Sequence, residues 1–228
     1  MLIVLEGLDG AGKSTQVKKL KEYLTERCGE LEYIHFPRYG APVYGDLIGR
    51  FLKGEFGSIE EVHPQLVALL FAEDRHRAAP MMREALEAGK VVLLDRYVYS
   101  NIAYQCAKLP QGPERIRLRN WIFNTEYGDF NLPEPDLNIF LDVPIGFVEQ
   151  SLSSHRSGSD REYLGRGENK DIHEADIRFQ ESVRDLYRSE AARDPHFLRI
   201  DCGDADGKML PPDAIFEKVR AAVDPYLV

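Results

Sequence analysis

The chain begins with a stretch whose residue types and spacing suit the binding of a polyphosphate. Residues 3–15 read IVLEGLDGAGKST, an apolar run followed by a glycine-rich turn. The turn matches G-x-x-x-x-G-K-[ST], in which backbone N–H groups face phosphate oxygens, a lysine neutralises them and a hydroxyl ligates Mg²⁺. A helical pattern follows, and the positive end of its dipole would add to the site. The predicted phosphate-binding residues are Gly7, Leu8, Asp9, Gly10, Ala11, Gly12, Lys13, Ser14 and Thr15.

Two carboxylates accompany this loop. Asp95 ends the apolar run VVLLD, and ligands bind at the carboxyl ends of strands in open α/β sheets. Arg96 places a second charged group at the same edge, which favours a site over an aspartate that merely caps a loop. Asp9 lies inside the loop, where it needs a cation or a substrate hydroxyl beside it unless its side chain turns away. We predict Ser14 and Asp95 as oxygen donors around Mg²⁺, with Asp9 as a third candidate donor beside its alternative role at a substrate hydroxyl.

The elements that would position these groups alternate along the chain. Short apolar runs predict buried strands at 2–5, 33–36, 91–94, 139–143 and 197–200. Apolar residues at helical spacing predict helices after Lys13, around 47–52, over 63–88 and around 177–187, with Gly89 ending the third. This order predicts an α/β fold with a mostly parallel five-stranded sheet and helices on both faces.

A chain of 228 residues could form one α/β domain or two small ones. The alternation of strands and helices over its full length, without an internal repeat, predicts one domain. The one shift in composition is at 151–171, where Ser, Gly and charged residues replace apolar ones, and we interpret that segment as a lid. The net charge of -9 argues against nucleic-acid binding. Three scattered cysteines make a disulfide framework improbable, and the sequence contains no signal-peptide or membrane-span pattern, so we expect a cytoplasmic protein.

Four segments together resemble the thymidylate kinase family. They are EGLDGAGKST at 6–15, FPRYG at 36–40, LLFAEDR at 69–75 and DRYVYSNIAYQ at 95–105. The likeness covers residues 1 to about 145 with the motifs in order, and continues more loosely beyond. It implies a P-loop kinase that passes the γ-phosphoryl group of ATP to dTMP, with Mg²⁺ as cofactor and a homodimer as the assembly.

The resemblance also implies which residues bind the acceptor. Arg96 and Arg38 resemble the pair that grips the dTMP phosphate, which suits a guanidinium fork. Phe71 and Arg75 lie four apart on one helical face and resemble the pair that stacks on thymine and contacts its carbonyl edge. Periodicity alone would place Phe71 in the core.

A second group of acceptor residues follows from the same resemblance. Asn101 would hydrogen-bond the thymine edge, and Tyr104 would crowd the 2′ position of the sugar. Tyr39 would approach the sugar or phosphate, and Asp9 the acceptor's 3′-hydroxyl or the metal. Without the resemblance, Asn101 and Tyr104 would be interpreted as helix surface and core.

The departures from the family pattern direct attention to the lid. Some thymidylate kinases carry a basic residue where this loop has Gly10, so the missing charge would come from the lid, which offers Arg156, Arg161, Arg166 and Lys170. His173 stands before Glu174, where many relatives have tyrosine. We therefore predict Lys13, Arg96 and Asp9 as catalytic residues, together with Arg156 and Arg161 of the lid.

Two other functions stay open at this point. The loop and the Asp95–Arg96 edge suit kinases for other nucleosides or nucleotides. A nucleotide-dependent switch is a further alternative, weakened by the lack of a guanine-reading N-K-x-D run.

Overall fold

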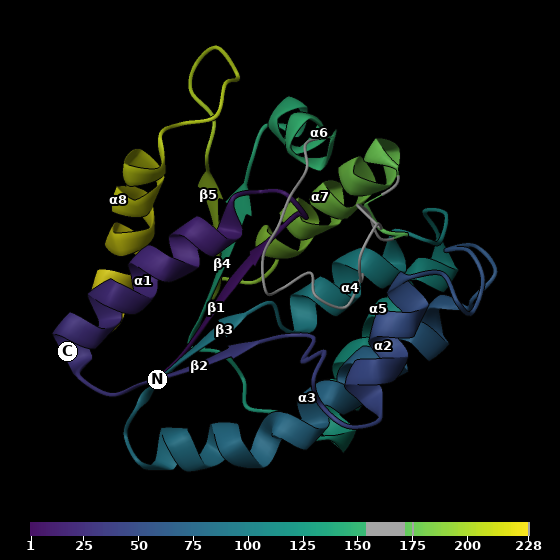
Figure 1. Cartoon of the computed structure of the whole chain (residues 1–228), viewed down its shortest axis with the longest axis horizontal. Helices are drawn as coiled ribbons and strands as arrows, with labels where there is room; N and C mark the ends of the chain where they lie inside the picture. The colour runs from purple at the N-terminus through teal and green to yellow at the C-terminus, as the bar shows by residue number, and fades with distance from the viewer. Residues whose placement is uncertain (154–171, 175, 228) are drawn as a thin grey trace.

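The computed structural model describes residues 1–153, 172–174 and 176–227, and it confirms the predicted α/β class. The sheet is parallel throughout, with the strand order β2-β3-β1-β4-β5 (Figure 1). Its strands are β1 (Leu2–Gly7), β2 (Leu31–His35), β3 (Val91–Asp95), β4 (Leu137–Asp142) and β5 (Phe197–Asp201). Each overlaps one predicted apolar run.

The central strands are apolar because helices cover both faces of the sheet. Every residue of β1, β3 and β4 is buried, as is typical of parallel sheets. Leu5 of β1 pairs in register with Asp95 of β3. The register therefore places the loop after β1 next to the Asp95–Arg96 edge.

Helices flank the sheet on both sides (Figure 1). α1 and α8 pack together on one face, and α3, α4, α5 and α7 lie on the other. The helices are α1 (Lys13–Cys28), α2 (Tyr44–Leu52), α3 (Pro64–Glu87), α4 (Val98–Cys106), α5 (Pro113–Phe123), α6 (Ile145–Ser153), α7 (Ile177–Ala191) and α8 (Pro212–Val223). Within the described ranges, no helix is both long and apolar enough to cross a membrane.

Glycines shape the phosphate loop. Gly10 and Gly12 have φ of 74° and 72°, and α1 begins directly after Gly12. A side chain at such a φ strains the backbone, so the absence of a basic residue at position 10 suits the conformation of this loop.

A π-helix that the sequence did not predict follows α5. This element, η1 (Asn124–Asp129), packs against α3 and α5. A second short element, the 3₁₀ turn η3 (Asp224–Tyr226), lies near the C-terminal end of the described chain. Glu126 of η1 is fully buried. The wider turn of η1 thus carries a carboxylate into the protein interior.

Candidate functional site

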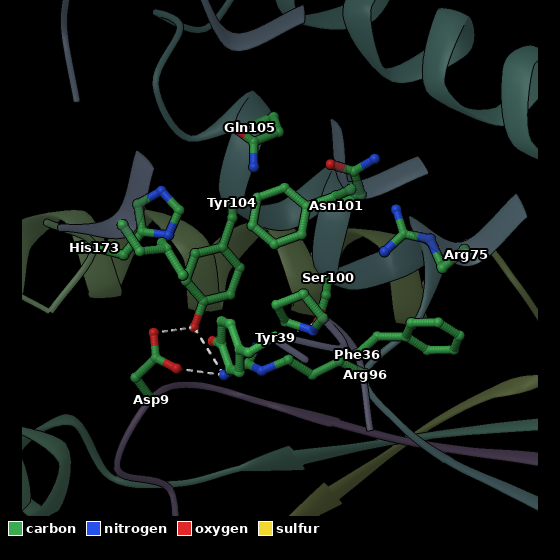
Figure 2. Close-up of a pocket in the computed structure, with 13 residues that line it drawn as sticks. Asp9, Phe36, Tyr39, Arg75, Arg96, Ser100, Asn101, Tyr104, Gln105 and His173 are labelled. Atoms are coloured by element: carbon green, nitrogen blue, oxygen red, sulfur yellow. Dashed lines mark hydrogen bonds and ion pairs between the residues drawn. The ribbon is translucent and has the colours of Figure 1, made fainter. Parts of the chain in front are cut away.

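A cavity of about 470 Å³ lies beside the phosphate loop. The loop after β1, the loop after β2, α3, the turn after β3 and α4 all contribute to it (Figure 2). Seven of the residues predicted from the sequence line it: Asp9, Tyr39, Phe71, Arg75, Arg96, Asn101 and Tyr104. Residues from five separate segments therefore converge on one space.

Arg96 and Asp9 form the charged end of this cavity. Arg96 Nη2 lies 2.5 Å from Asp9 Oδ1 and 3.3 Å from the Tyr104 hydroxyl, which donates to Asp9 Oδ2 at 2.7 Å (Figure 2). Burial raises the pKa of Asp9, but Arg96, Tyr104 and Lys13 outweigh it and hold that pKa below its usual value. Asp9 is therefore ionised at neutral pH, and Arg96 offers its guanidinium to an anion.

A buried glutamate, Glu6, holds the turn that carries Arg96. Arg96 has φ of 69°, a conformation that is strained for a residue with a side chain. Glu6 accepts hydrogen bonds from the backbone N–H groups of Tyr97 and Ser100, at 2.9 and 3.1 Å, and from the hydroxyls of Ser100 and Tyr187, at 2.5 and 2.9 Å. These bonds hold the turn after β3 in the shape that directs Arg96.

The opposite wall of the cavity is suited to a flat ring. Phe71 and Arg75 of α3 and Asn101 of α4 all line it. Phe71 is only partly buried, so it is available to a ligand, contrary to what its periodicity alone predicts. Arg75 is almost fully buried and forms a two-bond ion pair with Glu126.

Arg38 lies outside this lining. Its backbone N–H and Nε donate to the two carboxylate oxygens of Asp74 at 2.8 and 2.9 Å, and Nη2 donates to the Asp74 carbonyl at 2.7 Å. Arg38 also stacks against Phe36, which does line the cavity. In this structure Arg38 is held next to the site and paired.

Lys13 contacts the second predicted acid. Its Nζ forms an ion pair with Asp95 Oδ1, and His35 Nδ1 lies 3.2 Å from Asp95 Oδ2. Although burial raises the pKa of Asp95, Lys13 and His35 lower it far below its usual value. Asp95 is thus a buried anion at neutral pH, held by two bases.

Replacing Asp95 by asparagine is expected to lower the free energy of unfolding by about 3 kcal/mol at pH 7, since it breaks a buried ion pair. A carboxylate with a lowered folded-state pKa stabilises the fold above its unfolded value, 3.8, and that stability is lost as the pH falls below it. The difference between the variant and the parent should therefore shrink at pH 3. Urea unfolding at both pH values measures it, and a difference that is unchanged at pH 3 would contradict the ionised state of Asp95.

Ser14 and Asp95 line a common hollow with Lys18, Lys21, Glu22 and Tyr33. A serine hydroxyl and a carboxylate are hard oxygen ligands of the kind that Mg²⁺ prefers. Among the described residues, no three His, Cys, Asp or Glu side chains form a cluster for a metal. Such a sparse set fits an ion that takes most of its remaining ligands from substrate phosphates and water.

A further hollow of about 780 Å³ borders the other side of the phosphate loop. Ala11, Gly12, Thr15 and Gln16 face it from the loop and α1. Mostly apolar residues complete its lining: Leu141, Phe147, Cys202, Met209, Leu210, Pro211, Pro212 and Ile215. This hollow therefore borders the loop in addition to the main cavity and the hollow at Ser14.

Several residues around the main cavity escaped prediction. Glu6 had a visible signal, because it is a charge inside an otherwise apolar strand. Ser100 and Gln105 lie within the segment 95–105, but no role was predicted for them, and Glu126 had no signal. His173 also lines the cavity, and burial with the nearby Lys108 lowers its pKa well below the usual value, so its imidazole is neutral. The predicted lid basic residues, Arg156, Arg161, Arg166 and Lys170, lie outside the described residues.

Comparisons with known proteins agree on one family. The family model described as thymidylate kinase matches residues 5–205. A thymidylate kinase of Mycobacterium tuberculosis is 34% identical over 193 residues, which cover 85% of this chain and 86% of that protein. One of Clavibacter sepedonicus is 34% identical over 224 residues, covering 97% and 93%. A solved thymidylate kinase of Candida albicans superposes with a TM-score of 0.71 at 27% identity, covering 99% of this chain and 91% of that one.

Proposed function

Since the chain belongs to the thymidylate kinase family, and so transfers a phosphoryl group from ATP to dTMP to give ADP and dTDP, we propose that the 470 Å³ cavity is its dTMP site. One observation carries this proposal: seven residues from separate segments converge on a single space beside the phosphate loop. The space has a cationic end at Arg96 and a wall suited to a base at Phe71. A nucleoside monophosphate has the same two ends.

The proposed chemistry relies on position and charge. A phosphate oxygen of dTMP is already ionised near neutral pH, so in-line attack on the γ-phosphorus of ATP needs no strong base. Arg96 would hold the acceptor phosphate, and Lys13 would leave Asp95 to neutralise the oxygens of ATP. Asp9 would keep Arg96 oriented through their ion pair.

The donor nucleotide would occupy the opposite side of the loop. The residues from Gly7 to Thr15 would bind the ATP phosphates, and the 780 Å³ hollow, with its apolar lining, would receive the adenosine. Residues of the phosphate loop line both spaces, so the transferred phosphoryl group would lie between donor and acceptor at this loop.

Mg²⁺ is part of the proposal, because the Ser14 hydroxyl and the Asp95 carboxylate face one hollow at the loop. Asp9 is the third predicted donor, although its present partners are Arg96 and Tyr104. When bound, the ion would neutralise charge on the phosphates of ATP.

The assembly and the lid complete the proposal. We propose one domain in which the segment near 151–171 acts as a lid, with Arg156 or Arg161 adding positive charge to the transferred group. A homodimer is proposed from the family membership, and Leu66 and Leu69 of α3 are exposed apolar residues that suit such an interface. A cytoplasmic location stays a prediction.

Replacing Arg75 by lysine tests the base-binding wall. The variant keeps a positive charge opposite Glu126 but loses the planar fork. We expect kcat/KM for dTMP to fall at least tenfold while KM for ATP changes less than twofold. ADP release at varied dTMP and at varied ATP measures kcat/KM for dTMP and KM for ATP. The same assay with dUMP, UMP, CMP and thymidine compares the other acceptors.

The control for this experiment is Arg83→Ala on the same helix, since Arg83 bonds only the Asn131 carbonyl in the described structure. It should behave like the parent protein. Equal losses for ATP and dTMP in the Arg75 variant would show that Arg75 does not read the acceptor.

A further inference from the structure

We propose that Glu126, on the π-helix η1, is a positioning residue that determines which base the acceptor cavity takes, because it holds both Arg75 and Asn101. The proposal rests on the assignment of this cavity to the acceptor nucleotide. Glu126 has no exposed surface and is not part of the cavity lining. Any effect on the base must therefore pass through its two partners.

The contacts of Glu126 join α3, α4 and η1. Arg75 Nε donates to Oε2 at 2.5 Å, and Arg75 Nη2 donates to Oε1 at 2.8 Å. Asn101 Nδ2 also donates to Oε1, at 2.8 Å, and to the carbonyl of Ala68, at 3.0 Å. A buried carboxylate thus accepts three hydrogen bonds from two residues of the cavity wall.

These bonds determine which way the Asn101 amide faces. Both neighbours of its nitrogen, the Glu126 carboxylate and the Ala68 carbonyl, can only accept hydrogen bonds. A turned amide would place its oxygen against two other oxygens, which is unfavourable in a buried site. The Asn101 Oδ1 atom is therefore left over, and it is buried with no hydrogen-bond partner among the described residues.

The same carboxylate determines what Arg75 can offer. Glu126 takes Nε and Nη2, so Nη1 is the nitrogen outside this fork. Arginine donates hydrogen bonds and never accepts them. Arg75 and Asn101 both line the cavity (Figure 2), and the groups that Glu126 leaves to them are N–H donors on Arg75 and one acceptor, Asn101 Oδ1.

This pattern selects one kind of base edge. A ring N–H beside a carbonyl, as in thymine and uracil, satisfies both the Asn101 oxygen and the Arg75 nitrogen. Cytosine presents an unprotonated ring nitrogen beside an amino group. The Asn101 oxygen would then face another acceptor, and the Arg75 nitrogen would face another donor. Sites built to bond a particular polar edge reject the mismatched one strongly, because buried groups are left unpaired.

The substitution Glu126→Gln would remove the constraint on the orientation of Asn101 and Arg75. The glutamine amide has one accepting oxygen and one donating NH₂ group, so it cannot accept all three hydrogen bonds. The donating group would face either Arg75 or Asn101, and the Asn101 amide would no longer be held in one orientation. We therefore expect Glu126→Gln to lower kcat/KM for dTMP at least tenfold and to shrink the ratio of kcat/KM for dTMP over dCMP at least tenfold, with KM for ATP within twofold.

The matched control is Glu190→Gln. Glu190 is also fully buried, and it pairs with Arg119 through two nitrogens on the far side of α4 from the cavity. It should lose stability but keep the dTMP over dCMP ratio of the parent. An unchanged ratio in Glu126→Gln, or an equal change in Glu190→Gln, would overturn the role of Glu126.

A measurement on the unaltered protein decides the matter if Glu126→Gln does not fold. The two amide protons of Asn101 should be protected from solvent exchange in NMR spectra without nucleotide, since Glu126 and Ala68 already bind them. Protection that arises only after dTMP is added would overturn the proposal. Arg75→Lys distinguishes failure of the cavity assignment from failure of the role of Glu126. If kcat/KM for dTMP is unchanged in Arg75→Lys, the cavity assignment is wrong. If kcat/KM for dTMP falls in Arg75→Lys but the dTMP over dCMP ratio is unchanged in Glu126→Gln, only the role of Glu126 is contradicted.

Discussion

Replacing Lys13 by alanine is expected to lower kcat about 10²–10³-fold, the usual cost of removing one group that stabilises charge in a transition state. Lys13 begins α1 at the end of the glycine loop, where the helix dipole and the loop N–H groups also favour phosphate. In the structure its Nζ pairs with Asp95. Alanine removes the only lysine that the loop brings to this position.

The measurement is ADP release at saturating ATP and dTMP, with circular dichroism to show that the variant is folded. His35 stays beside Asp95 in the variant, so the buried carboxylate keeps one partner. Lys19→Ala is the matched control, because Lys19 lies on the same helix but pairs with Asp213 on the surface. Near-normal turnover in the Lys13 variant would mean that this loop does not bind the transferred phosphate.

The strands and the parallel class of the sheet could be predicted because each strand is encoded locally. The central strands are buried on both faces, so each appears in the sequence as an apolar run, and the phosphate loop follows the first of them. Phe71 and Arg75, or Asn101 and Tyr104, could be paired in the same way from their helical spacing. Their common target came only from the family resemblance.

The contacts that hold these residues in place could not be predicted, because each joins residues that lie far apart in the sequence. Glu126 is 51 positions from Arg75 and sits on a π-helix that has no periodic signal. Lys13 meets Asp95 across 82 positions, and Glu6 reaches Ser100 across 94. Local patterns identify the residues of a site, whereas the sheet register and helix packing determine which of them share hydrogen bonds.

Arg96→Lys is the second variant with a large expected effect. Although burial lowers the pKa of the Arg96 guanidinium, Tyr104 and Asp9 raise it well above its usual range, so its charge is permanent. Lysine keeps the charge and also keeps a side chain at φ of 69°, so the strained backbone is unchanged. What it loses is the planar fork that bonds Asp9, Tyr104 and Ser100 while facing the cavity.

We expect Arg96→Lys to lower kcat/KM for dTMP about 10²–10³-fold, since an ammonium is a point charge without the planar fork that bonds two phosphate oxygens side by side. KM for ATP should stay within twofold, because Arg96 lies on the acceptor side of the loop. Arg119→Lys provides the control, as Arg119 also pairs with a buried carboxylate but lies away from the cavity. If the Arg96 variant retained the parent kcat/KM, a point charge would suffice, and the geometry that Glu6 maintains around Arg96 would have no part in binding the acceptor.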